Sequence, residues 1–383
     1  MKCIVNGKII LEDKVLFNSV IIFDEKIQKI LPENEVNTNE YEVIDANGNF
    51  VAPGLVDMHI HGFLGCDASD GDEEGIKKMA EGIVKNGVTS WCPTTMTVSK
   101  KEIEKAFDTI RDVKNQKGYY GAKIIGVNSE GPFINSAKKG AQAEEHILKP
   151  DASFIKNHKD IIKLFTVAPE VDGAIECIKE VKNDTDVLIS MGHTNATYEE
   201  AKCGIENGVG HTTHLFNAMS PLSHRSLGVV GAALKEDVTV ELIADTFHVD
   251  KGLFEIVAKL KDDKLCLITD CIRAGGMEDG NYTLGGQPLK KEGIKCLMAD
   301  GTIAGSVLNL NDGVKNLYEN TNLEIYDAVK CASLNPAKAL KVDDKIGSIK
   351  EGKCADLITL DDNFSVKMTV IDGEIRYKGE WKW

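Results

Sequence analysis

The feature that most constrains the fold is a repeated alternation of short apolar runs and helical patterns between residues 53 and 341. Residues 73–86 carry Ile76, Met79 and Ile83 at helical spacing, and residues 89–94 then form an apolar run of strand length. About eight such units over about 290 residues predict an α/β protein built on a (β/α)8 TIM barrel. A doubly wound open sheet is the alternative, but no GxGxxG motif follows the first strand.

The remaining segments continue this rhythm. A second helix is predicted over residues 100–113 from its one-sided apolar positions. Further strands are predicted over residues 123–128, 164–167, 187–191, 209–213, 238–243 and 265–270.

Both ends of the chain have a different texture, with β-branched runs separated by turn dipeptides. Hairpins are predicted over residues 3–11 and 20–30, and Asp372-Gly373 between two alternating runs predicts a third. We therefore expect residues 1–52 and 342–383 to form one small β-sandwich domain, with the barrel of residues 53–341 inserted between them.

Composition limits the partners and the compartment. The net charge of -15 argues against binding to nucleic acid or to an anionic membrane surface. No apolar run approaches the about 18 residues that span a bilayer, and no signal peptide is evident at the N-terminus. The ten cysteines include no CxxC pair, which favours reduced thiols in the cytoplasm.

A pair of histidines follows the first apolar run of the barrel segment. His59 and His61 are two residues apart, so their side chains project to the same side of a strand. Neighbouring glycines let backbone or ligand approach closely. Two converging imidazoles at a strand end suit a metal ion, although an HxH pattern alone is short enough to arise by chance.

Other polar residues stand at the ends of later predicted strands. Glu130, His193, His214 and Asp270 do so, and the carboxyl ends of barrel strands meet at one face. We expect them to join the histidine pair there. His211 lies inside a strand and is expected to be a packing residue.

This mixed set of histidines and carboxylates suits Zn²⁺ first, with Fe²⁺ as the alternative. A metal ion in such a site activates water as a nucleophile near pH 7. Asp270, on the last predicted strand, is placed to take the proton of that water and return it to a leaving group. The chemistry expected is hydrolysis at a carbonyl or a similarly polarised carbon.

With these residues the sequence resembles the amidohydrolase superfamily and, within it, the family of N-acetylglucosamine-6-phosphate deacetylases. The HxH motif and the closing stretch at residues 346–357 are typical of the superfamily, whereas Glu-Gly-Pro-Phe and His-Leu-Phe-Asn-Ala-Met are typical of the deacetylases. The shared stretches lie at residues 52–62, 129–133, 192–194, 213–219, 224–231, 245–248, 269–270 and 304–306.

The resemblance implies hydrolytic deacetylation of N-acetylglucosamine 6-phosphate to glucosamine 6-phosphate and acetate, a step of amino-sugar catabolism. It implies that Glu130, His193 and His214 bind the shared metal, that His59 and His61 contribute to a second ion where one is bound, and that Asp270 is the acid/base. The implied substrate contacts are Ala141, Gln142, Asn217, Ala218, Arg225, His248, Ile303, Ala304 and Gly305.

By the same resemblance, Arg225 and His248 bind the sugar phosphate, and the arginine reaches in from a neighbouring subunit of a homodimer. An arginine fork suits phosphate and supplies the cation that an acidic protein needs there. Three positions depart from the family. Ser226-Leu227 replace an acidic residue and a proline, which is expected to loosen the loop, and Gln142 stands where some relatives have histidine.

Two other functions are considered. Another amidohydrolase, such as a dihydroorotase-like amidase or a deaminase, would share the metal site; dihydroorotase-like members bridge two ions with a carboxylated lysine, whereas Glu130 stands at that place here. A non-catalytic sugar-phosphate sensor on the same fold would have lost ligands or the acid, and this chain keeps all of them.

Overall fold

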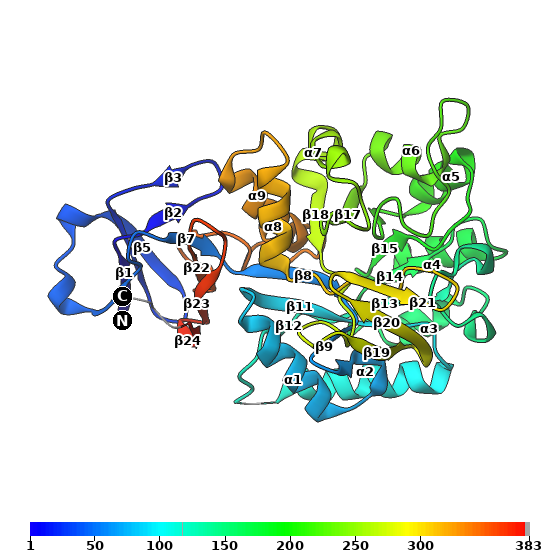
Figure 1. Cartoon of the computed structure of the whole chain (residues 1–383), viewed down its shortest axis with the longest axis horizontal. Coiled ribbons are helices and arrows are strands. Elements are labelled where there is room, and N and C mark those ends of the chain that lie inside the picture. The colour runs from blue at the N-terminus through cyan, green and yellow to red at the C-terminus, as the bar shows by residue number, and fades with distance from the viewer. Residues whose placement is uncertain (117, 380–383) are drawn as a thin grey trace.

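The computed structural model describes residues 1–116 and 118–379. Its centre is a closed barrel of eight parallel strands (Figure 1). The barrel closes between its first and last strands, where the Asp270 amide donates to the His59 carbonyl at 2.9 Å and Ile60 bridges Cys271 in parallel. The expected (β/α)8 barrel is therefore confirmed. Its strands are β8 (Leu55–Ile60), β11 (Val88–Thr95), β13 (Val127–Phe133), β14 (Ile162–Val167), β15 (Leu188–Met191), β16 (His211–Thr212), β17 (Thr239–Ile243) and β18 (Leu265–Ile268).

Helices cover the outside of the barrel. The predicted helices over residues 73–86 and 100–113 are found as α1 (Glu73–Val84) and α2 (Lys100–Asn115). The Ser99 hydroxyl and the Glu102 carboxylate form a capping box that starts α2, and its apolar face is buried against the barrel. The other helices are α3 (Ala152–Asn157), α4 (Ala174–Asp184), α5 (Tyr198–Asn207), α6 (Gly228–Lys235), α7 (Phe254–Lys261), α8 (Leu310–Glu319), α9 (Ile325–Cys331) and α10 (Leu334–Ala339).

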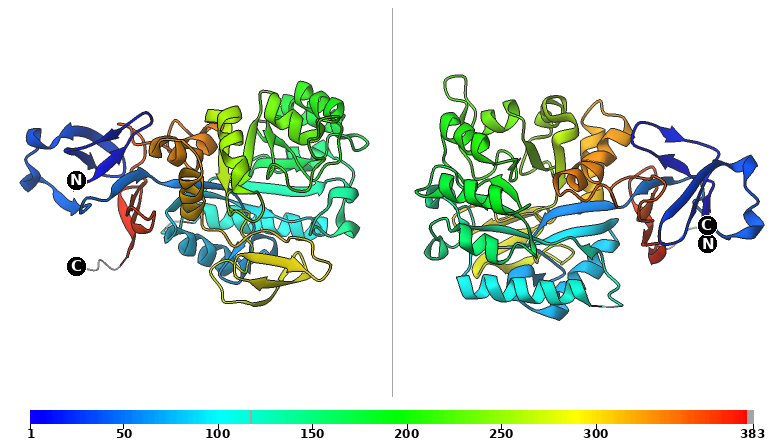
Figure 2. Two further views of the ribbon diagram at one scale, coloured as in Figure 1. Left: turned by 45° about the horizontal axis from the view of Figure 1, so that its top comes forward. Right: turned by 180° about the vertical axis from the view of Figure 1, so that it is seen from behind.

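The terminal strands of residues 2–53 and 357–378 lie at one end of the molecule, beside the barrel (Figure 2). One sheet has the strand order β5-β4-β1-β6 and the other β24-β23-β22-β7-β2-β3, so the second combines both ends of the chain. Apolar side chains of both ends share one buried cluster. The strands are β1 (Lys2–Val5), β2 (Lys8–Ile10), β3 (Val15–Leu16), β4 (Ser19–Phe23), β5 (Ile27–Pro32), β6 (Glu42–Asp45), β7 (Phe50–Pro53), β22 (Leu357–Leu360), β23 (Val366–Ile371) and β24 (Glu374–Lys378).

Two hairpin predictions hold and one is wrong. β23 and β24 pair antiparallel around Asp372-Gly373, and β4 pairs with β5. The expected hairpin over residues 3–11 does not form, because β1 pairs with β4 and β6 while β2 pairs with β3 and β7. Asn6, at φ 54°, turns the chain between the two sheets, and a side chain at Gly7 would clash with Val51.

Two further segments differ from expectation. The strand expected over residues 123–128 is split into β12 (Lys123–Ile124) and β13, and Gly126 between them lies where a Cβ would be 2.5 Å from the Ile161 carbonyl oxygen. A three-stranded antiparallel sheet after β18 was missed; it consists of β19 (Gly280–Leu284), β20 (Gln287–Glu292) and β21 (Lys295–Met298).

No helix among residues 1–116 and 118–379 has the length and apolar character needed to cross a bilayer. All ten cysteines are unpaired.

Candidate active site

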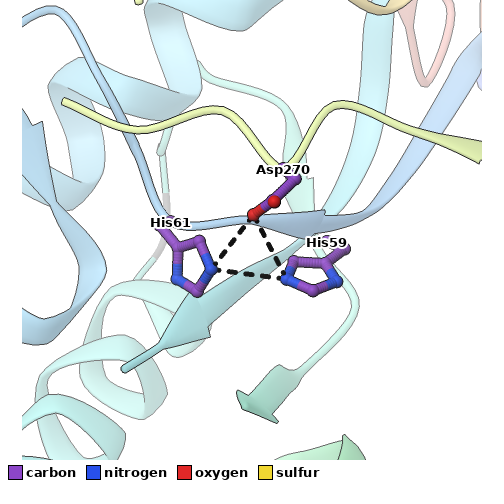
Figure 3. Close-up of side chains that lie close together, drawn as sticks. All are labelled: His59, His61 and Asp270. Atoms are coloured by element: carbon purple, nitrogen blue, oxygen red, sulfur yellow. Dashed lines mark hydrogen bonds and ion pairs between the residues drawn. The ribbon is translucent and has the colours of Figure 1, made fainter. Parts of the chain in front are cut away.

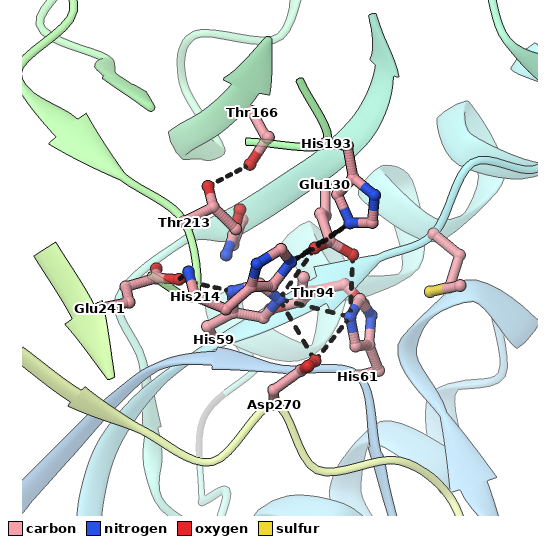
Figure 4. Close-up of polar contacts among 12 residues, drawn as sticks. His59, His61, Thr94, Glu130, Thr166, His193, Thr213, His214, Glu241 and Asp270 are labelled. Atoms are coloured by element: carbon pink, nitrogen blue, oxygen red, sulfur yellow. Dashed lines mark hydrogen bonds and ion pairs between the residues drawn. The ribbon is translucent and has the colours of Figure 1, made fainter. Parts of the chain in front are cut away.

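The six residues singled out at strand ends converge at one end of the barrel (Figure 4). They come from five different strands or the turns that follow them, and all six are buried. They fall into two groups whose ligand atoms lie within 4.8 Å of one another. The first group is His59, His61 and Asp270, and the second is Glu130, His193 and His214.

The first group joins the first and last barrel strands. His59 Nε2 lies 3.3 Å from His61 Nε2, and Asp270 Oδ1 lies 3.2 Å from His61 Nε2 and 3.5 Å from His59 Nε2 (Figure 3). Ile60 is turned away, as the strand period requires. Asp270, expected to act only as an acid/base, therefore also lies where it could bind a metal ion together with the two histidines.

The second group is centred on Glu130. Its Oε1 lies 3.0 Å from His193 Nε2 and 2.8 Å from His214 Nε2, and the two imidazole nitrogens are 3.2 Å apart. The other oxygen, Oε2, lies 3.1 Å from His61 Nε2. Oε1 also lies 3.5 Å from His59 Nε2, so Glu130 contacts both groups.

The hydrogen bonds of the rings test whether this site fits a metal. The Nδ1 atoms of His59, His61 and His193 face the Glu241 carboxylate and the carbonyls of Thr94 and Lys138, at 2.9, 3.1 and 2.8 Å. These acceptors require Nδ1–H, so in a neutral ring Nε2 presents a lone pair to the centre. The Nε2 atoms of His59 and His61 lie 3.3 Å apart. This separation matches that of two ligand atoms which each lie about 2.1 Å from one Zn²⁺. The donor set fits a divalent metal.

The charges of the site also favour a bound metal ion. Burial opposes protonation of His59, but the carboxylates of Glu241, Glu130 and Asp270 outweigh it and raise its pKa to about 9. Burial would also raise the pKa of Asp270, yet the hydrogen bond from His61 and the charge of His59 lower it below its ordinary value. The centre is thus strongly attractive to positive charge, and Asp270 is ionised at neutral pH.

Three of the six residues have a strained backbone. His193, His214 and Asp270 have φ values of 46°, 25° and 49°, a region that residues other than glycine rarely adopt. Gly131, beside Glu130, has φ 93°, and a Cβ there would lie 2.0 Å from Thr97 Oγ1. Such conformations persist only where surrounding contacts hold them, and they are typical of functional sites.

A cavity of about 390 Å³ opens onto this centre. It is large enough for a small ligand. Its walls include Ala141, Gln142, Asn217, Ala218, His248, Ile303 and Gly305, seven of the nine expected substrate contacts. Ala304 is buried beside it and donates its amide to the Cys296 carbonyl.

Arg225 is the expected contact that lies elsewhere. It is exposed in the loop before α6 and does not line the cavity of its own chain. His248 does line it, held by Asp245, whose carboxylate accepts from both the ring Nδ1 at 2.6 Å and the His248 amide at 2.8 Å. Within the described residues of one chain, Lys138 is the only lysine or arginine on the cavity wall.

The supporting roles of three residues were not predicted from the sequence. Gln142 donates to Glu130 Oε2 at 2.6 Å and accepts from the Thr97 amide, so it supports a candidate metal ligand as well as lining the cavity. Glu241 accepts from His59, and His211, expected only to pack, lies 3.1 Å from Glu241. The signal for Glu241 was present: it is the one charged residue in the apolar run of residues 238–243.

Comparison with known proteins agrees with this geometry. Residues 50–376 match the amidohydrolase family. The chain is 36% identical to N-acetylglucosamine-6-phosphate deacetylase of Bacillus subtilis (strain 168), over 96% of this chain and 95% of that one. It is 32% identical to N-acetylgalactosamine-6-phosphate deacetylase of Escherichia coli O157:H7, over 87% and 89% of the two chains.

Among solved structures, N-acetylglucosamine-6-phosphate deacetylase from Pasteurella multocida superimposes with a TM-score of 0.93 at 32% identity, covering 98% of this chain and 99% of that one. Both the sequence and the fold therefore match over nearly their whole length. The chain belongs to the amidohydrolase family and, within it, to the N-acetylglucosamine-6-phosphate deacetylases.

Proposed function

We propose that this protein hydrolyses the acetamide of N-acetylglucosamine 6-phosphate and releases glucosamine 6-phosphate and acetate. The observation that carries the proposal is a centre of four histidines and two carboxylates, five of which line a cavity together with seven of the expected substrate contacts. The identity of the substrate is inferred from the names of the relatives. Glu130, not a lysine, contacts both groups of ligands, which separates this site from a dihydroorotase-like one.

The two groups are proposed to hold one or two divalent ions, with Zn²⁺ preferred and Fe²⁺ as the alternative. Glu130, His193 and His214 would hold the first ion, and His59, His61 and Asp270 the second. A divalent metal in such a site supplies Lewis acidity, which polarises a carbonyl and lowers the pKa of water.

Asp270 is proposed to move the proton. Its carboxylate faces the cavity and is ionised, so it can accept a proton from the attacking water. The protonated carboxyl group of Asp270 can then donate that proton to the amine nitrogen as the C–N bond breaks. The His59 carbonyl and the Ser306 amide hold the Asp270 backbone at 2.9 and 2.8 Å, which fixes the position of the carboxylate.

We further propose that the sugar phosphate is bound by His248 of one chain and by Arg225 of a second chain in a homodimer. The proposal rests on the family resemblance and on the exposed position of Arg225 outside its own cavity. Mixing Arg225→Ala and Asp270→Asn chains, each almost inactive alone, tests it. If the arginine crosses, one site of each mixed dimer is complete, and about a quarter of wild-type activity returns. No recovery in verified mixed dimers would contradict it.

The substrate is tested by measuring acetate released from N-acetylglucosamine 6-phosphate, from its galacto epimer and from unphosphorylated N-acetylglucosamine. We expect the phosphorylated gluco sugar to have the highest kcat/KM. The galacto epimer is the second candidate, because one relative at 32% identity is named for it. Equal turnover with and without the phosphate would contradict the proposed substrate.

The two terminal sheets and the barrel are proposed as separate domains, divided at residues 52/53 and 341/342. The unpaired cysteines are proposed to reflect a reducing cytoplasm.

A further inference from the structure

Glu241 is a fully buried carboxylate that the proposed reaction does not use. It lies in β17, and its exposed fraction is 0%. Its neighbours Val240 and Leu242 join the main apolar cluster. An ionised carboxylate in such surroundings is costly unless its lone pairs are filled by donors.

Three donors from two other strand segments fill those lone pairs. Oε2 accepts from His59 Nδ1 at 2.9 Å and from the His214 backbone amide at 2.9 Å. Oε1 lies 3.1 Å from His211 Nε2, and the other ring nitrogen of His211 bonds to Thr239. One oxygen of Glu241 thus touches one candidate ligand from each metal group, as the labelled side chains in Figure 4 indicate.

The contact with His214 acts where the chain is strained. β16 ends at Thr212, and His214 follows with φ 25°. The His214 amide donates to the Glu241 side chain, and the next amide, that of Leu215, donates to the Glu241 backbone carbonyl at 2.9 Å. Two consecutive amides are therefore fixed by one residue, and this bend directs the His214 ring toward Glu130.

We propose that Glu241 is a positioning residue shared by both metal sites, orienting His59 through its ring and His214 through its backbone. His211 holds the far oxygen and so fixes the carboxylate itself. Partners of this kind set ring orientation and ligand basicity, and their loss typically weakens metal binding about 10–100-fold. The inference rests on the proposed metal binding, but not on the identity of the substrate.

The test uses the full-length protein and measures metal affinity by competition with a chelator, using Zn²⁺ and Co²⁺. Glu241→Met removes both acceptors at similar size, and Glu241→Gln keeps one acceptor oxygen if the first variant does not fold. Asp356→Asn is the matched control, because Asp356 is also a buried carboxylate but pairs with Lys123 at 2.8 Å, outside both metal groups. Unmodified protein that retains no metal would refute the proposed function before this inference is tested.

We expect Glu241→Met to lower metal affinity about 10–100-fold and to change the Co²⁺ absorption spectrum, with a smaller effect from Glu241→Gln. The control should change thermal stability but neither metal readout. In a His59→Ala, His61→Ala background, Glu241→Met should still weaken the remaining site, because it acts there through the His214 backbone. Metal affinity equal to that of the control, or no effect in this background, would overturn the shared role.

Discussion

Replacing Asp270 by asparagine separates proton transfer from folding. Asparagine is one of the few residues that tolerates a positive φ, so the backbone at 49° is retained, and its amide matches the carboxylate in size. It cannot accept a proton in the reaction. General acid–base catalysis contributes about 10²–10⁴-fold, so kcat should fall by that factor, which corresponds to about 3–5 kcal/mol of transition-state stabilisation.

The assay compares steady-state acetate release by the wild type and by Asp270→Asn, with metal content measured on the same samples. KM should change little, because Asp270 is proposed to act in the chemical step rather than in phosphate binding. Asparagine keeps one oxygen toward His61 and His59, so metal should be retained. Full activity in a metal-loaded variant would refute the role given to Asp270.

Three other changes test the physical account. In metal-free protein, nearby carboxylates raise the pKa of His59 above its ordinary 6.5 to about 9 despite its burial, so this stabilisation is complete below pH 6.5 and lost as the pH rises to about 9. In urea unfolding with EDTA present, the free energy of unfolding should fall by up to about 3 kcal/mol between pH 6 and 9. A free energy of unfolding that stays constant over this range would contradict the raised pKa of His59. Gly131→Ala should lower the free energy of unfolding, measured by thermal unfolding, by about 1–3 kcal/mol, because of the positive φ at this position and the clash with Thr97. An unchanged melting temperature would contradict the strain. Lys123→Met should lower the free energy of unfolding, measured in urea, by about 2–4 kcal/mol, because it leaves the buried Asp356 without its cation. Its kcat should stay at the wild-type value. An unchanged urea midpoint would show that the ion pair does not stabilise the fold.

The barrel and its centre could be predicted because their signals are local. Apolar periodicity marks the strands and helices, and the HxH spacing puts His59 and His61 on one side whatever the tertiary structure. Glu130, His193, His214 and Asp270 followed from the rule that strand ends of a barrel share a face. The Asp372-Gly373 turn needed only its own dipeptide, since both residues adopt positive φ values.

What could not be predicted depends on contacts between distant segments. Asn6-Gly7 looks like a hairpin turn, yet β1 and β2 enter different sheets because their partners, β4 and β7, lie further along the chain. The contact of Gln142 with Glu130 joins a loop to β13, and the three bonds of Glu241 join β17 to β8 and to the segment of residues 211–214. A single charged residue in an apolar strand marks a buried polar network, but not its partners.

The most direct test of the account is to remove the metal and add it back. Protein dialysed against a chelator until it is metal-free is assayed for acetate release from N-acetylglucosamine 6-phosphate, and then titrated with Zn²⁺ or Fe²⁺. We expect the rate to fall at least about 100-fold and to return when one or two ions per chain are bound, with one acetate formed per amine. Hydrolysis at an undiminished rate by verified metal-free protein would contradict it.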